Sequence, residues 1–144
     1  MEETMKSILT GSAPLPVGPY SQAVLSTGGE YLFLSGQLGL DLSGAIVKGS
    51  VEAEAKQVFA NIEAVLAAAG MGRRNVVKTT IFLKDMNDFS VVNSLYETFF
   101  GDHRPARSTI EVSRLPKGGL IEIEAIAVKA GGSSCQESTS AEVE

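Results

Sequence analysis

The chain has 144 residues, of which 44% are hydrophobic and 20% charged, and its formal net charge is −5. This size and composition are typical of one globular domain with a single hydrophobic core. The acidic balance excludes a general attraction for nucleic acid or anionic membranes, and no apolar run approaches the ~20 residues of a membrane helix. One cysteine and one histidine leave little for a disulfide framework or a metal site.

The N-terminal half begins with features of β structure. The segments YSQAVLS (20–26) and EYLFLS (30–35) are strand-like, and Thr-Gly-Gly at 27–29 is typical of a tight turn, so we predict a hairpin. DLSGA at 41–45 predicts a further turn. The opening MEETMKSILT lacks the features of a signal or transit peptide, and we therefore expect a cytoplasmic protein.

A helix is predicted after Ser50. Ser50 is a good N-cap, and the acids Glu52 and Glu54 in the first turn suit the helix dipole. Gly70 is expected to end the helix. The apolar positions trace one helical stripe, which must lie on a sheet; they are Val51, Ala55, Val58, Phe59, Ile62, Val65, Leu66 and Ala69.

The C-terminal half alternates strands with one more helix. The segment 75–84 is rich in β-branched residues and predicts a strand. Asp88 is expected to cap a helix over 89–100, and strands are predicted near 106–114 and 120–129. This order predicts an α+β fold, in which two helices pack on one face of a mixed β-sheet.

The last strand carries apolar residues on both faces. One face holds Ile121, Ile123, Ala125 and Ala127, and the other holds Leu120, Glu122, Glu124, Ile126 and Val128. A strand of this kind indicates that the second face of the sheet is covered by partner subunits.

Arg107 is the most informative charged residue. It begins a strand in which we place Ile110 and Val112 in the core, so it must find an anion or stay at a solvated rim. Two interpretations remain open from spacing alone. Arg107 is either a surface arginine paired with Glu122 or Glu124, or a guanidinium that grips a ligand carboxylate in bidentate fashion.

Other polar residues give weaker signals. Alternating glutamates usually mark a solvated face, but the apolar neighbours of Glu122 and Glu124 make a partly buried acid–base group a reasonable alternative. His103 is expected to be a solvated loop residue. Cys135 lies in the polar, acidic segment 131–144, which we predict to be disordered, and we interpret it as an incidental thiol.

Several stretches together resemble the RidA/YjgF family of reactive-intermediate deaminases. They are GPYSQAV (18–24), YLFLSGQLGLD (31–41), VVKTTIFLKDMNDFSVVNSLYETFF (76–100) and PARSTIEVSRLPKGGLIEIEAIAV (105–128). The resemblance implies a single domain over 1–130 with a chorismate mutase-like fold. It also implies a homotrimer with a central barrel-like core and ligand sites between subunits.

The resemblance also implies an activity. Members of this family hydrolyse 2-imino and enamine acids, such as 2-iminobutanoate and 2-iminopropanoate, to 2-oxo acids and ammonia. They receive these compounds from pyridoxal-phosphate enzymes, and they use no cofactor and no metal. A small-molecule substrate is therefore expected, with no membrane partner and no nucleic acid.

Residue roles follow where the motifs match. Arg107 is similar to the arginine that clamps the substrate carboxylate, Glu122 to the residue that activates water, and Tyr20 to an aromatic that lines the pocket. By the same resemblance Glu124 is structural. Further binding residues implied by the motifs are Ser35, Gly36, Asn93 and Thr109.

Two departures from the family pattern affect the expected pocket. Thr109 stands where the family commonly has cysteine, and the loop before Pro105 is shorter, with Arg104 in place of an aromatic residue. The family is also associated with endoribonuclease activity and inhibition of translation, and with non-enzymatic ligand binding. An RNase, or a trimer that only binds 2-oxo acids, therefore remain alternatives to the deaminase.

Overall fold

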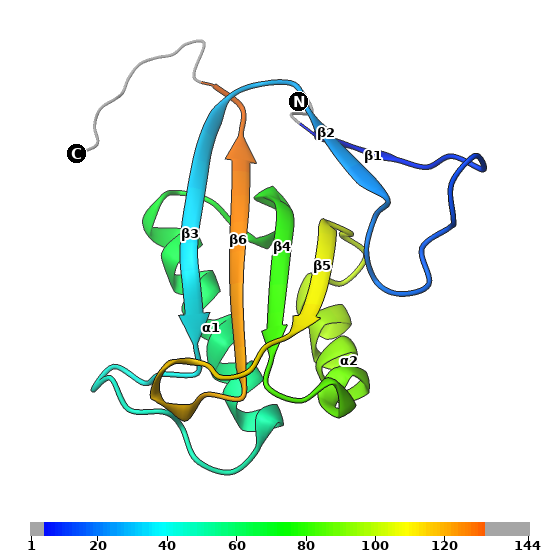
Figure 1. Cartoon of the computed structure of the whole chain (residues 1–144). Coiled ribbons are helices and arrows are strands. Elements are labelled where there is room, and N and C mark those ends of the chain that lie inside the picture. The colour runs from blue at the N-terminus through cyan, green and yellow to red at the C-terminus, as the bar shows by residue number, and fades with distance from the viewer. Residues whose placement is uncertain (1–4, 132–144) are drawn as a thin grey trace.

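The computed structural model describes residues 5–131, so the tail predicted to be disordered lies outside the described residues apart from Gly131. Within that range the chain forms the two helices and six strands shown in Figure 1. They are β1 (Met5–Ile8), β2 (Ala23–Ser26), β3 (Glu30–Leu38), α1 (Val51–Ala68), β4 (Val76–Leu83), α2 (Phe89–Phe100), β5 (Ala106–Glu111) and β6 (Ile121–Lys129). None of the helices in this range is long and apolar enough to span a membrane.

The main sheet is mixed and has the order β3-β6-β4-β5. Strand β6 runs antiparallel to both β3 and β4, whereas β5 runs parallel to β4 after the crossover through α2. Both helices lie on the same face of this sheet (Figure 1). The predicted α+β architecture, with two helices on one face of a mixed sheet, is confirmed.

Helix α1 begins and ends where the sequence predicted. The Ser50 hydroxyl accepts a hydrogen bond from the backbone N–H of Ala53 at 3.3 Å. At the other end Gly70 adopts a φ of 72°, and the Met71 N–H donates to the Leu66 carbonyl at 2.9 Å. The glycine is favoured because a left-handed residue lets the chain turn back onto the last helical carbonyls.

Helix α2 also has the predicted limits, but its first turn is held differently. Asp88 occupies the N-cap position without a side-chain cap hydrogen bond. Asp85 acts instead on the preceding 3₁₀ turn, where its carboxylate accepts from the Asn87 N–H at 2.9 Å. The helix packs aromatic residues onto α1, and the Phe59 and Phe99 rings stack with centroids 4.7 Å apart. Each large side chain buried in this way stabilises the fold by ~1.5–3 kcal/mol.

The two faces of the main sheet differ. The face under the helices is buried and apolar, and in β6 it holds Ile121, Ile123, Ala125 and Ala127, as predicted. We call the opposite face the open face because neither helix covers it. Its residues include Phe33, Lys78, Thr80, Glu122, Glu124 and Ile126.

The prediction that Ile110 points to the core is wrong. Ile110 is 44% exposed and Val112 is only partly buried. In β5 the odd positions Arg107 and Thr109 pair with Thr79 and Ile81, which are buried under the helices. Alternation along the strand therefore places Ile110 on the open face.

The predicted hairpin between 20–26 and 30–35 is also wrong. Both strands exist, but β2 pairs with β1, and the pairings of β3 in the described residues are with β6 alone. We call residues 5–26 the arm, and Figure 1 shows it beside β5. The Ser21 N–H donates to the Pro105 carbonyl at 3.0 Å, and Ser21 bridges Ala106. These contacts hold the arm at the β5 edge, which a turn signal in the sequence does not reveal.

Candidate active site

Arg107 lies near the start of β5, on the side of the sheet that faces the helices. Its guanidinium is half-buried, and Nη1 donates to Oδ1 of Asn93 on α2 at 2.6 Å. None of the ion pairs formed by residues 5–131 involves Arg107. The interpretation of Arg107 as a surface partner of Glu122 or Glu124 is therefore wrong for a single chain, because both acids lie on the other face of the sheet.

Aromatic rings surround the Arg107 guanidinium. Its carbon Cζ lies 5.2 Å from the ring centroid of Tyr20, 5.6 Å from that of Phe89 and 5.0 Å from that of Tyr96. These are cation–π distances. Burial lowers the pKa of Arg107, yet a guanidinium stays charged in proteins. A partly desolvated cation without a counter-ion attracts a carboxylate more strongly than a solvated one does.

The arm completes this arrangement. Tyr20 lies two residues after Gly18, and a Cβ built on Gly18 would lie 3.5 Å from Nη2 of Arg107 and 3.6 Å from Nδ2 of Asn93. The Gly18 backbone therefore approaches both polar side chains closely. Gly18, Phe89 and Tyr96 were missed by the sequence reasoning, although Gly18 belongs to the GPYSQ motif.

Thr109 lies two residues after Arg107 on the same face of β5. Its hydroxyl oxygen is buried, and it forms no hydrogen bond with the part of the chain that the structure describes. A buried hydroxyl without a partner is costly and calls for a ligand, a water or another chain. We call Arg107, Asn93, Tyr20, Phe89, Tyr96 and Thr109 the arginine group.

Glu122 lies near the start of β6, on the open face. A Cβ built on Gly36 would overlap its Oε2 atom and lie 2.8 Å from its carboxyl carbon. Only glycine therefore leaves room for the carboxylate, where β3 changes register between Leu34 and Gln37. Ser35 is exposed beside it, and its carbonyl accepts from Nε2 of Gln37 at 3.2 Å. We call Glu122, Gly36 and Ser35 the glutamate group.

The two groups do not meet within one chain. In the sheet register Arg107 is level with Thr79 and Ala125, and Glu122 lies three residues before Ala125 in β6, two strands away from β5. These offsets are roughly 10 Å along the strands and roughly 10 Å across them. The two side chains also point to opposite faces, so a single chain does not bring them together.

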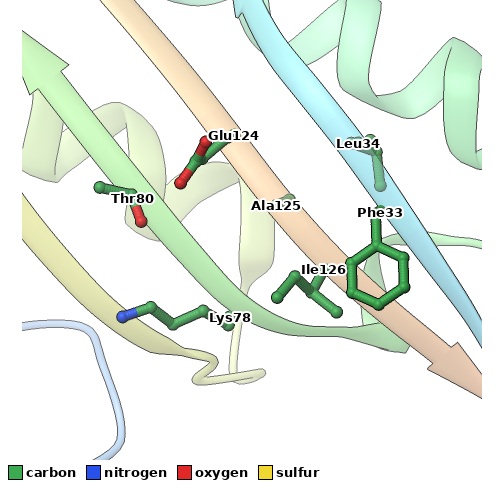
Figure 2. A pocket seen from close by; sticks show the side chains of 7 residues that line it. All are labelled: Phe33, Leu34, Lys78, Thr80, Glu124, Ala125 and Ile126. Atoms are coloured by element: carbon green, nitrogen blue, oxygen red, sulfur yellow. The ribbon is translucent and has the colours of Figure 1, made fainter.

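The open face contains a cavity of about 280 Å³ beyond the glutamate group. Figure 2 shows its lining, with Lys78, Thr80 and Glu124 beside the apolar Phe33 and Ile126. Lys78 Nζ donates to the Ser108 hydroxyl at 3.3 Å. Glu124 is exposed here. The open face therefore carries two charged residues, Lys78 and Glu124, among apolar neighbours.

His103 is not the solvated loop residue that the sequence suggested. It is partly buried, with Nε2 2.7 Å from the Val76 carbonyl oxygen and its ring 6.0 Å from that of Phe100. Burial lowers its pKa below the usual value. Residues 5–131 contain no group of three or more His, Cys, Asp or Glu that could hold a metal ion.

Comparisons with known proteins find relatives over most of the chain. A family model described as "Endoribonuclease L-PSP" matches residues 10–129. A bovine protein named 2-iminobutanoate/2-iminopropanoate deaminase is 52% identical over 125 residues, which cover 86% of this chain and 90% of the bovine protein. Relatives from goat, mouse, rat and human carry the same name.

Solved structures share the fold. The YyfB protein of Yersinia pestis, from the conserved Rid protein family, superposes with a TM-score of 0.82 at 28% identity, over 88% of this chain and 100% of that one. The YjgF gene product of E. coli gives a TM-score of 0.66 at 46% identity, over 86% and 98%. The chain therefore belongs to the RidA/YjgF family, whose members share its α+β fold.

Proposed function

We propose that this protein is a deaminase. It hydrolyses 2-imino acids and their enamine tautomers, such as 2-iminobutanoate and 2-iminopropanoate, to 2-oxo acids and ammonia. The observation that carries the proposal is the half-buried Arg107 guanidinium, which has an amide and three aromatic rings around it but no acidic partner in residues 5–131. The names of the mammalian relatives support the choice of substrate.

Arg107 binds the carboxylate of the substrate. Asn93 occupies Nη1, so the rest of the guanidinium fork is available to the two carboxylate oxygens. Each charge-assisted hydrogen bond of this kind contributes ~1.5–3 kcal/mol. The Thr109 hydroxyl, which is buried and has no hydrogen-bond partner within residues 5–131, supplies a further donor, and the Tyr20 ring forms a wall of the pocket.

Glu122 assists the attack of water. Its carboxylate takes a proton as the water oxygen bonds to the imine carbon, and the C=N π electrons move to nitrogen. It then returns this proton to that nitrogen, which gives the neutral carbinolamine. A second proton passes from the carbinolamine hydroxyl through the same carboxylate to nitrogen, so that the C=O bond forms, the C–N bond breaks and ammonia leaves a 2-oxo acid behind. The Gly36 and Ser35 backbone lies beside the reacting groups.

The proposed site needs two chains. Because Arg107 and Glu122 lie on opposite faces of one sheet, they act together only when Glu122 comes from another copy. The open face supports such an assembly, since Phe33, which lines the cavity of Figure 2, is 71% exposed. Tyr31, whose ring stacks on that of Phe33, is 51% exposed. We propose a homotrimer of single domains over 1–130, in the cytoplasm, beside the pyridoxal-phosphate enzymes that release such imines.

The decisive experiment is imine hydrolysis by an Arg107→Ala variant. 2-Iminobutanoate is generated in situ by a threonine dehydratase, and 2-oxobutanoate formation is followed with and without the protein. We expect no acceleration by Arg107→Ala, with the oligomer intact. Arg114→Ala is the matched control, because Arg114 is exposed and lies beyond the end of β5, in the segment that leads to β6. Normal turnover by Arg107→Ala would show that Arg107 does not bind the substrate carboxylate.

The assembly is tested separately by Phe33→Asp. A carboxylate in the centre of an apolar contact is costly because it cannot be solvated there. We expect a smaller particle by light scattering and loss of turnover at the same time. A Phe33→Asp protein that keeps the size and activity of the wild type would show that the open face is not the interface.

RNA cleavage is the second candidate, favoured by the description of the matching family model. The chain has 12 Lys and Arg against 17 Asp and Glu, which is a poor basis for binding phosphates, since nucleic-acid binding recruits ~6–10 such contacts. Highly purified protein is incubated with RNA at near-physiological salt. Cleavage that depends on Arg107 would favour the RNase, and tight 2-oxobutanoate binding without imine turnover would favour a pure binding protein.

A further inference from the structure

Tyr96 is a buried residue of α2 with a polar tether. Its side chain is fully buried, and its hydroxyl lies 2.7 Å from the Thr79 hydroxyl on β4. Its ring contacts that of Phe100, with centroids 4.7 Å apart, and that of Phe59 at 6.2 Å. The ring is thus fixed by packing from α1 and α2, and the hydroxyl fixes it to the sheet.

The tether lies directly beneath the arginine group. Thr79 pairs with Arg107 in the register of β4 and β5, and the Tyr96 ring centroid lies 5.0 Å from Arg107 Cζ. Asn93, which binds Nη1, precedes Tyr96 by three residues on α2, so both side chains lie on the same side of the helix. The hydrogen bond between the Tyr96 and Thr79 hydroxyls therefore fixes α2 against β4, and with it the positions of the Asn93 amide and the Tyr96 ring relative to Arg107.

The ring supplies orientation without neutralising the cation. Burial raises the pKa of Tyr96 to about 12, so the phenol is neutral at any working pH. A neutral ring offers its π face to the guanidinium, whereas a tyrosinate or a carboxylate would compete with the substrate for the same charge. Arg107 is thus held in place by Asn93 and Tyr96 without an ion-pair partner in residues 5–131.

We propose that Tyr96, tethered by Thr79, is a positioning residue that orients the Arg107 guanidinium for a planar carboxylate ligand. Tyr96 contacts no substrate and acts through Arg107. The inference rests on the carboxylate clamp of the proposed function. It adds that the affinity of the clamp depends on a buried hydroxyl pair that lies outside the ligand pocket.

The test separates positioning from stability. Tyr96→Phe leaves the Thr79 hydroxyl buried without its partner and lowers stability, whereas Tyr96→Phe with Thr79→Val removes both hydroxyls and restores much of it. In the double variant we expect a melting temperature near that of the wild type. We also expect KM for 2-iminobutanoate and Kd for 2-oxobutanoate to be raised about 3–10-fold, with kcat within about twofold. Recovery of both affinity and stability would show a merely structural role.

A double-mutant cycle tests whether Tyr96 acts on ligand affinity through Arg107. Calorimetry measures 2-oxobutanoate binding by Tyr96→Phe in the Arg107 and Arg107→Lys backgrounds, because lysine has no planar fork to orient. We expect a clear loss of affinity with Arg107 and a change below about twofold with lysine. Equal losses in both backgrounds would overturn the inference while leaving the proposed function in place. No 2-oxobutanoate binding by the wild-type protein would overturn the clamp itself, and with it this inference.

Discussion

The arginine group and the glutamate group differ in how far one chain completes them. Arg107 has a hydrogen-bond partner, three aromatic rings and the arm around it. Glu122 has neither a hydrogen bond nor an ion pair to any side chain of residues 5–131. Its carboxylate occupies the space that a Cβ atom at position 36 would fill. The first group is built within the chain, and the second is a surface feature.

The difference has a physical cause. A half-buried cation must be held by dipoles and π faces of its own chain, or it moves out to water. A carboxylate on a sheet face is solvated as long as that face is open. It gains strength as a base only when a second chain covers the face and excludes water. The arginine group should therefore bind ligand by its own contacts, whereas the glutamate group should depend on assembly.

Gly36→Ala is expected to have the largest effect. The new methyl group overlaps the Glu122 carboxylate and displaces it, while the rest of the chain is unchanged. Loss of a positioned acid–base group lowers kcat by ~10²–10⁴-fold. We expect such a fall with 2-oxobutanoate affinity nearly intact, because the arginine group is untouched. Gly72→Ala, where a methyl group meets open space, is the matched control. Full activity of Gly36→Ala would remove Glu122 from the mechanism.

Mixing two inactive variants should restore part of the activity. Arg107→Ala keeps its glutamate group and Glu122→Gln keeps its arginine group. If each site takes one group from each of two neighbouring chains, random trimers of the two variants contain about one intact site in four. The mixture is unfolded and refolded together, and imine turnover is compared with that of each variant refolded alone. Activity no higher than that of the parents would show that the groups do not combine across chains.

Thr109→Val tests the remaining polar atom of the arginine group. Its hydroxyl is buried without a partner in the described part of the chain, so an apolar residue of the same shape should raise the free energy of unfolding by ~1 kcal/mol. If the hydroxyl donates to the substrate, KM for 2-iminobutanoate should rise several-fold in the same variant. Urea unfolding and steady-state kinetics measure the two effects. Lower stability with an unchanged KM would mean that the hydroxyl already has a structural partner in the assembly.

The sequence predicted the parts of the molecule that local physics determines. The stripe of α1, its Ser50 cap and the Gly70 stop are local signals, and the structure confirms them. The alternation in β6 likewise predicted its buried face correctly. These features depend on neighbours a few residues apart, so a pattern in the sequence is enough to find them.

Long-range relations were beyond the sequence. A Thr-Gly-Gly turn is compatible with a hairpin, but contacts from Ser21 to the segment before β5 decide where the arm lies. The face of Ile110 was assigned wrongly, because one edge strand gives no internal sign of which side the helices cover. Resemblance to a family separated Glu122 from Glu124, and the roles of both stay predictions. Nothing in the sequence distinguished Tyr96 from an ordinary core aromatic.

A pH effect of smaller size is expected at the segment that leads into the arginine group. His103 is partly buried against the Val76 carbonyl, and burial lowers its pKa below the ~6.5 of an unfolded chain. Above that pH neither state binds the proton, and the contribution of His103 to stability is fully present. As the pH falls, the unfolded state takes up the proton first, so this stability is lost progressively until the folded pKa is passed.

The pH effect is measured as the difference in melting temperature between the wild type and His103→Gln, which keeps a donor for Val76 but does not titrate. Between pH 7.5 and pH 5 we expect the melting temperature of the wild type to fall relative to that of His103→Gln. Because the segment from His103 to Pro105 also anchors the arm through Ser21, affinity for 2-oxobutanoate should weaken over the same range in the wild type alone. A difference in melting temperature that is constant with pH would mean that the pKa of His103 is the same in the folded and unfolded protein. Any loss of 2-oxobutanoate affinity at low pH would then have a cause other than His103.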